Sequence, residues 1–461
     1  MKKNDIYVLQ ELQKIIGLIS LLAVAVYWFN PIIRLFIYTI IFAVYYFSRN
    51  NVFWLSLFFI LISAPFDLFY GRFSWFILLT SNVGVPFSVL FYIISYIKVQ
   101  RISMVNNSFK SYYHYISIYI LFLIVIGLIF GPNQASLFRM IIVLPNFTVF
   151  IFLPQLLDKE IKIVKFNKIV LSFSIVIAIF SIIQIILPYN LLKIITNSKD
   201  AFIIDHGVMR QTGGIFICLY SFVLSLYYLN LNMKHFTKKF LYIVIFSSLF
   251  FIFNSATRGW ILASIFILFL YFLFFKTKSL KLIFTIAMFG VIVILYTPKE
   301  VKQNITKSYK RLATISNLTE GDLTADGTLS RLTVRSPKVM NKYIESPIIG
   351  FGYSKVTENY HDKHVGNQSL LLSGGILGFL LMYGVLIAIC KKIVFFGRIY
   401  FKTKNLFIIF IIGIFGILII HSSSMQMFGF YMDARAAFLI SAILTNFNIL
   451  MNQYNRRQNN L

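Results

Sequence analysis

The sequence predicts an all-α, polytopic integral membrane protein with about 12–14 transmembrane helices and one large outer loop that contains short helices. Composition is the first reason, because 59% of the 461 residues are hydrophobic and only 13% are charged. No water-soluble domain shows that balance. Apolar runs of about 17–25 residues are the second reason, since each is long enough to cross roughly 30 Å of hydrocarbon. The runs are continuous rather than alternating, which excludes a β-barrel.

The predicted spans follow one another through mostly short connectors. They cover residues 15–29, 31–47, 52–70, 75–97, 113–131, 137–156, 168–188, 211–230, 240–256, 259–275, 281–297, 368–390, 405–421 and 435–451. Only Asn30-Pro31 separates the first two, so they form either a helical hairpin or one broken helix. No small-residue cleavage site closes the first run, which predicts a retained span and not a signal peptide.

These spans divide the chain into four regions. They are an amino-terminal bundle over residues 1–200, helices with candidate arginines over 201–297, the large outer loop over 298–367, and the carboxyl-terminal helices over 368–461. The two cysteines, Cys218 and Cys390, both fall inside predicted spans. Neither a disulfide framework nor a thiolate metal site is therefore expected.

The basic residues predict the orientation of the chain. The net charge is +28, but the lysines and arginines are spread over many connectors, so no nucleic-acid partner is expected. With a cytoplasmic amino terminus, nearly every lysine-rich connector lies on the cytoplasmic side, as the positive-inside rule requires. Both termini are then cytoplasmic, and the long segments Pro188–Arg210 and Pro298–Asn367 lie on the outer, periplasmic or extracellular, face.

The larger outer segment has a mixed character. It holds eleven Lys/Arg and seven Asp/Glu, so it is not simply a basic tether. Apolar residues early in it recur at helical spacing and predict an amphipathic helix on the membrane surface or over a cavity. Ser336 and Pro337 are typical of the N-cap and first turn of a second helix. The recurring apolar residues are Val301, Ile305, Tyr309, Leu312 and Ile315.

Two arginines lie where spans meet the outer face. Arg210 precedes a span that begins near Gly213 and Gly214, and a glycine pair lets the backbone approach a bulky anion. Arg258 lies between two spans that leave no room for a real loop, where its guanidinium would present a rigid charged fork to phosphate. The alternatives are an Arg210 that snorkels to lipid headgroups and an Arg258 that forms an ordinary interfacial turn.

The outer loop carries a second polar group. His361 and His364 have the spacing of a helical metal pair, but no third ligand cluster accompanies them, so we expect no metal. Histidine titrates near neutral pH, as a general base should, and His364 lies shortly before the chain re-enters the membrane. Arg331 and Arg335 precede a turn, Pro347 to Gly352, and are candidate substrate contacts.

Weaker signals lie between the last two predicted spans. His421 and three serines close one span, and Asp433 with Arg435 opens the next. A local ion pair or a helix cap is the favoured interpretation there.

These residues resemble a known family. The segment Ser255-Ala-Thr-Arg-Gly259 resembles the Ser-x-x-Arg-Gly motif of the O-antigen polymerase and ligase family of membrane glycosyltransferases. Its later motifs follow here in order over roughly residues 200 to 390. They are Arg331, Pro347-Ile-Ile-Gly-Phe-Gly352, His364 and Gly375-Ile-Leu-Gly378. The family's asparagine after the histidine is Val365 here and Asn367 stands two residues later, so the spacing to Gly375 favours His364 while His361 remains the alternative base.

The resemblance implies a reaction and its partners. The donor would be a glycan on polyprenyl (undecaprenyl) pyrophosphate, the acceptor a glycan hydroxyl, and the place the outer face of the bacterial cytoplasmic (inner) membrane. Arg210 and Arg258 would hold the pyrophosphate leaving group, and His364 would deprotonate the acceptor, a step worth about 10²–10⁴-fold. Anomeric inversion and no cofactor are implied. Arg331, Arg335, His361, Gly213, Gly214 and Asn367 would contact substrate.

Several functions remain open at this point. The favoured one is polymerisation of O-antigen or capsular polysaccharide repeat units, with a flippase and a chain-length regulator of the same pathway as partners alongside membrane lipids. An O-antigen ligase that passes glycan to the lipid A core of lipopolysaccharide shares the donor chemistry. A lipid-linked glycan flippase would need charges deep in the spans and internal symmetry, and neither is visible. A non-catalytic scaffold is the last alternative.

Overall fold

The chain folds into a bundle of helices. The computed structural model describes residues 3–28, 31–63, 77–80, 83–85, 87–101, 110–131, 143–186, 203–205, 208–210, 213–230, 235–255, 257–275, 284, 298–303, 305–306, 331–362, 364–400, 408–423, 426–428 and 433–459. Within these ranges, four helices are long and apolar enough to cross a membrane, and shorter apolar helices accompany them. The prediction of an all-α, polytopic membrane protein is confirmed.

The helices of the amino-terminal half follow the predicted spans. They are α1 (Lys3–Trp28), α2 (Pro31–Phe47), α3 (Asn51–Ile62), α4 (Phe87–Gln100), α5 (Lys110–Ile129), the 3-10 turn η2 (Leu144–Thr148), α7 (Val149–Leu156) and α8 (Glu160–Ile186). The first two predicted spans are thus two helices. The Asn50 side chain caps α3 by accepting the Phe53 N–H at 3.2 Å, which satisfies one of the donors that a helix start leaves unpaired.

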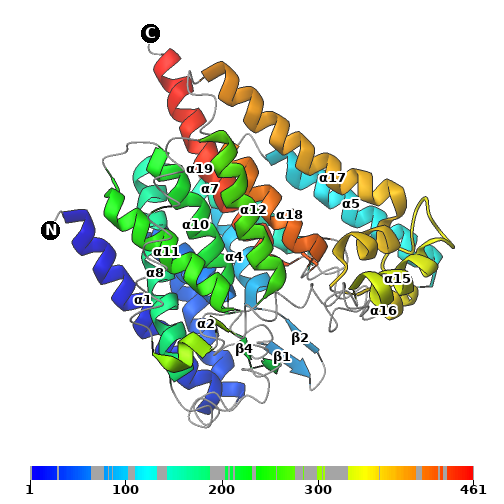
Figure 1. Cartoon of the computed structure of the whole chain (residues 1–461), viewed down its shortest axis with the longest axis horizontal. Helices are drawn as coiled ribbons and strands as arrows, with labels where there is room; N and C mark the ends of the chain where they lie inside the picture. The colour runs from blue at the N-terminus through cyan, green and yellow to red at the C-terminus, as the bar shows by residue number, and fades with distance from the viewer. Residues whose placement is uncertain are drawn as a thin grey trace.

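The carboxyl-terminal half continues the bundle and adds the outer-loop helices. It contains α10 (Ile215–Asn230), α11 (Lys238–Asn254), α12 (Arg258–Phe274), the π-helical turn η4 (Arg331–Arg335), α15 (Ser336–Tyr343), α16 (Lys355–Tyr360), α17 (Gly366–Tyr400), α18 (Ile408–Ser423) and α19 (Ala434–Asn459). Figure 1 shows α15 and α16 beside the start of α17, with α5 packed along α17.

Two antiparallel hairpins, which the sequence did not predict, lie at one end of the bundle (Figure 1). They pair β1 (Ile77–Thr80) with β2 (Val83–Val85), and β3 (Ile203–Asp205) with β4 (Val208–Arg210). The predicted span 75–97 is therefore wrong in its first half, where a hairpin precedes α4. The reason is local: the stretch Ser81-Asn-Val-Gly-Val-Pro86 places turn formers and a proline inside the apolar run. We call this end of the bundle the hairpin end.

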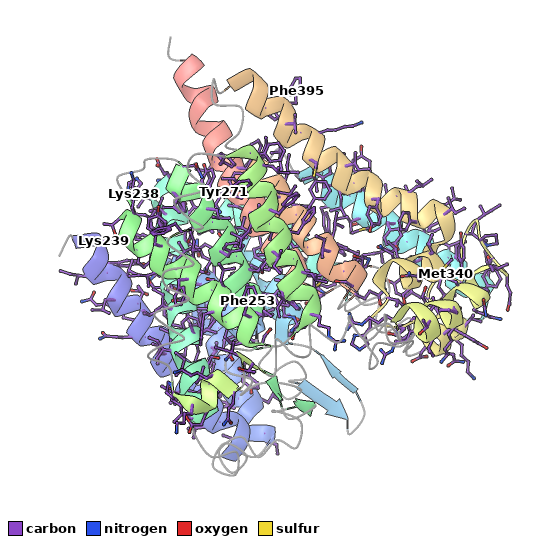
Figure 2. All side chains as sticks on the ribbon, viewed as in Figure 1. Lys238, Lys239, Phe253, Tyr271, Met340 and Phe395 are labelled. Carbon is purple, nitrogen blue, oxygen red and sulfur yellow. The ribbon has the colours of Figure 1, made fainter. Side chains whose placement is uncertain are left out.

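The positions of α11 and α12 show which of their residues lie at the hairpin end. Figure 2 places Lys238 and Lys239 at one end of α11 and Phe253, near the end of that helix, toward the hairpins. The next helix, α12, begins at Arg258 after a tight turn. Arg258 therefore lies at the hairpin end, while Tyr271 lies far from it (Figure 2).

A buried polar network joins three helices of the bundle, α8, α10 and α19. The Asn167 amide of α8 donates to the Tyr228 hydroxyl and to Asn446 Oδ1 of α19, both at 2.6 Å. The Tyr220 hydroxyl of α10 donates back to Asn167 Oδ1 at 2.6 Å. All four side chains are buried. Because hydrocarbon offers no other partner, these bonds fix the relative positions of the three helices.

The structure confirms one prediction for residues 298–367 and corrects another. The helix after Ser336-Pro337 is confirmed as α15, but Ser336 is its first residue and not its N-cap. The π-helical turn η4 runs directly into α15, so no helix start remains for Ser336 to cap. Of the predicted amphipathic helix, Val301 is buried and helical. Most of that helix, and the span 281–297 apart from residue 284, lie outside the described residues.

Candidate functional site

A break in α17 organises the outer loop. Gly375 has φ 62° and ψ −166°, so α17 consists of two helical pieces that meet there. A break inside an apolar helix leaves carbonyls of the first piece and N–H groups of the second without intrahelical partners. In a membrane protein such groups must find other partners within the protein.

The turn from Pro347 to Gly352 supplies those partners. The carbonyls of Pro347 and Ile348 accept the N–H groups of Ile376 and Leu377, at 2.9 and 3.1 Å. The N–H groups of Phe351 and Gly352 donate to the carbonyls of residues 372 and 373, at 2.9 and 2.7 Å. The turn thus caps both sides of the break, which gives a physical reason for the two glycine-containing motifs to occur together.

Glycine is required on both surfaces of this contact. A Cβ on Gly375 would lie 2.3 Å from the Ile348 carbonyl oxygen, and one on Gly350 would lie 2.5 Å from the Gly375 nitrogen. Gly352 makes a similar backbone contact with Gly127 of α5, where a Cβ would come within 2.2 Å of the Gly127 nitrogen. The turn is therefore held between α17 and α5.

Asp362 links η4 to the start of α17. Its Oδ1 accepts the His364 N–H at 2.7 Å and lies 3.4 Å from Arg335 Nη1. Its backbone exchanges two hydrogen bonds with the Ser369 hydroxyl, at 3.0 and 2.8 Å. Arg335 is thereby held against the start of α17. Sequence reasoning missed Asp362 as a positioning residue, although its place between His361 and His364 was a usable signal.

The two loop histidines differ in environment. His361 Nδ1 lies 3.0 Å from the carbonyl oxygens of Thr357 and Glu358. Because carbonyls only accept, Nδ1 carries the hydrogen and Nε2 keeps its lone pair, the tautomer that a general base needs. His364 is exposed, three residues along the same short connector, and its backbone is held by Asp362. The geometry therefore leaves both histidines as candidates for the base.

Arg258 begins α12 at the hairpin end and is half-buried. The N-terminus of a helix favours an anion, and the guanidinium adds a full positive charge to it. Ser255 and Thr257, which flank the turn, donate their hydroxyls to the carbonyls of Ile252 and Ser255. Those hydroxyls therefore stabilise the turn.

Next to Arg258, aromatic contacts bring a second arginine into the site. Trp260 of α12 meets the Phe216 ring of α10 edge-on, with centroids 4.9 Å apart. On the same Phe216 ring lies the Arg435 guanidinium of α19, at 4.8 Å. Arg435 also pairs with Asp433, Nη2 to Oδ2 at 2.6 Å, so the predicted local ion pair is present. Nothing in the sequence indicated that Arg435 would stack on a ring of α10.

The glycines after Arg210 have a structural role. Gly214 has φ 89° and donates its N–H to the Ser63 carbonyl at the end of α3, at 2.7 Å. A Cβ on Gly214 would lie 2.8 Å from Ile177 of α8. Gly213 is buried beside it. Arg210 ends β4, paired with Ile203, three residues before Gly213.

A continuous path of contacts connects the outer loop with the arginines. Gly366, at the start of α17, lies against His421 at the end of α18. His421 Nδ1 accepts the Met427 N–H at 2.9 Å, and the Met427 carbonyl accepts the Asp433 N–H at 3.2 Å. Asp433 holds Arg435, which stacks on the ring that Trp260 also contacts. The connector with His364 is thereby linked to the α12 start with Arg258.

Asn367 and Arg331 are the remaining predicted contact residues. Asn367 follows Gly366, and its Oδ1 accepts the Tyr383 hydroxyl at 2.6 Å. Arg331 lies in η4 and is half-buried. Burial raises the pKa of the nearby loop residue Tyr353, so its phenol stays neutral. Among the described residues, no group of three or more His, Cys, Asp or Glu side chains is placed to hold a metal ion.

The fold and the site define a polytopic helical membrane protein in which α15 and α16 lie against a broken helix, and Arg258 and Arg435 lie near each other at one end of the bundle. Residues 243–383 match the family model described as O-antigen ligase. The resemblance to that family is thereby confirmed over these residues. No curated protein and no solved structure matches the chain.

Proposed function

We propose that the protein is a membrane glycosyltransferase that polymerises polyprenyl-pyrophosphate-linked oligosaccharide repeat units at the outer face of the cytoplasmic membrane. Arg258 and Arg210 bind the pyrophosphate, which leaves as an anion and needs positive charge more than it needs an acid. His364, or His361 in its place, removes the proton from the acceptor hydroxyl. The acceptor oxygen bonds to the anomeric carbon as the carbon–phosphate oxygen bond breaks, with inversion.

One observation carries the proposal. The path from Gly366 through His421, Asp433 and Arg435 to the aromatic pair beside Arg258 links the histidine connector to the arginine end of the bundle. A donor pyrophosphate and an acceptor hydroxyl must meet within bond-forming distance, so the two groups must share one end of the bundle. The apolar helices around that end suit a polyprenyl chain.

A second candidate function is that of an O-antigen ligase, which uses the same donor and a different acceptor. The family match at residues 243–383 favours it directly, since that family is described by the ligase activity. Both functions predict the same arginine and histidine requirements. They differ only in whether the acceptor is another lipid-linked glycan or a lipid A core.

The test uses protein in membrane vesicles with purified lipid-linked donor. Arg258→Ala, His364→Ala and His361→Ala are assayed, and Arg101→Ala and His114→Ala serve as matched controls because both are exposed outside this site. We expect loss of transfer in Arg258→Ala and in one histidine variant, with normal insertion and normal controls. Full-length product ladders from Arg258→Ala and from both histidine variants would refute the roles. Labelled acceptors of each kind then separate polymerase from ligase.

A further inference from the structure

The end of α18 holds a polar cluster that the arginine and histidine roles leave unused. His421 is fully buried and Gln426 is 2% exposed. Ser422 and Ser423, which follow His421, are satisfied locally, because they donate their hydroxyls to carbonyls one helical turn earlier. His421 and Gln426, in contrast, each have buried polar side-chain atoms without such a partner among the described residues.

The hydrogen bonds of His421 fix its tautomer. Its Nδ1 accepts two backbone N–H groups, from Met427 at 2.9 Å and Phe428 at 3.3 Å. A nitrogen that accepts must carry a lone pair, so the hydrogen of the neutral ring is on Nε2. His421 therefore acts as a neutral hydrogen-bond donor, and its tautomer is opposite to that of His361.

Within the part of the chain that the structure describes, the His421 donor and the Gln426 amide have no hydrogen-bond partner. Among the described residues, no group bonds to His421 Nε2 or to either side-chain atom of Gln426, and all three atoms are buried. Buried polar groups cost free energy unless they are paired, so such a cluster points to a ligand. The N–H groups of Met427 and Phe428 bond to the His421 ring, so the backbone directly after Gln426 is held against that ring.

The position and chemistry of the cluster select the ligand. It lies between Gly366, whose Cα lies against the His421 ring and carbonyl, and Asp433, next to the Arg435–Phe216 stack. It offers two neutral donors and one acceptor and no cation. A phosphate would select the arginines instead, whereas sugar hydroxyl and acetamido groups both donate and accept.

We infer that His421 and Gln426 form a neutral subsite that hydrogen-bonds a sugar ring of the lipid-linked donor beside its pyrophosphate. The inference rests on the proposed function and extends it, because it divides recognition between arginines for the phosphates and this pair for the glycan. Both side chains are binding residues with no proton transfer of their own.

The test compares two probes on full-length protein in lipid nanodiscs. One is undecaprenyl pyrophosphate, and the other is the lipid-linked glycan that accumulates in cells lacking this protein. Gln426→Met keeps the volume and removes the hydrogen bonds. Gln155→Met, another buried glutamine, is the matched control on α7. We expect Gln426→Met to weaken binding of the glycan-bearing lipid by roughly ten-fold and to leave binding of undecaprenyl pyrophosphate unchanged.

Each result decides the inference. Equal weakening for both probes, or none for either, overturns the sugar subsite while wild-type binding still supports the proposed function. Wild-type protein that binds neither probe overturns both. His421→Gln gives a second measurement, and it should likewise discriminate between the probes if the inference is correct.

Discussion

The contact between the Pro347–Gly352 turn and the break in α17 makes a quantitative prediction for Gly375→Ala. The residue has φ 62°, and a new Cβ would lie 2.3 Å from the Ile348 carbonyl oxygen. Forcing a side chain into that backbone region costs roughly 1–3 kcal/mol. Displacing the turn also breaks the four hydrogen bonds across the break, worth about 1 kcal/mol each. The docked turn should lose about 5–7 kcal/mol, which is the sum of the two.

Hydrogen exchange of the purified protein measures this loss. Amides of Phe351, Gly352, Ile376 and Leu377 should exchange far faster in Gly375→Ala, and glycan transfer should fall with them. Gly384→Ala is the matched control, because it lies in the same helix with nothing within 4 Å of a new Cβ. It should leave exchange and transfer unchanged. Protection of the four amides at the wild-type level in Gly375→Ala would refute the capping role of the turn.

Three further predictions concern other contacts. Asn446→Leu should lower the unfolding temperature in detergent, since it removes the hydrogen bond that Asn446 accepts from the Asn167 amide and the one that it donates to the Tyr220 hydroxyl, worth about 0.5–1.5 kcal/mol each; an unchanged midpoint would contradict the network. Asp362→Asn should retain most transfer, because the amide oxygen still accepts the His364 N–H and the partly exposed pair with Arg335 is worth about 0–1 kcal/mol. Asp362→Ala should lose transfer, and equal activity of the two variants would contradict the positioning role. Tyr383→Phe should cost about 1 kcal/mol of stability through the lost hydrogen bond to Asn367, measured by thermal unfolding. An unchanged unfolding midpoint would show that this bond does not stabilise the protein.

Local properties made the helices predictable from sequence. Hydrocarbon accepts only segments that satisfy their own backbone, so an apolar run such as 168–188 had to be helical, and α8 covers nearly all of it. The same reasoning failed for 75–97, where Gly84 and Pro86 inside an apolar run permit a hairpin instead. The motif residues were identified from their types and their order along the chain, because residue type determines the chemistry that each side chain can perform.

Only the tertiary structure decided which of those residues meet. The Arg435 guanidinium contacts the Phe216 ring although the two residues are 219 positions apart in the sequence, counted from 216 to 435. The Pro347 carbonyl accepts the Ile376 N–H, and such a bond between backbone groups cannot be predicted from residue types. The tautomers of His361 and His421 likewise depend on which backbone groups surround each ring. Sequence determines the local preferences of each segment, whereas such long-range partners are set by the packing of the whole bundle, because every buried polar group must find its partner in one common arrangement.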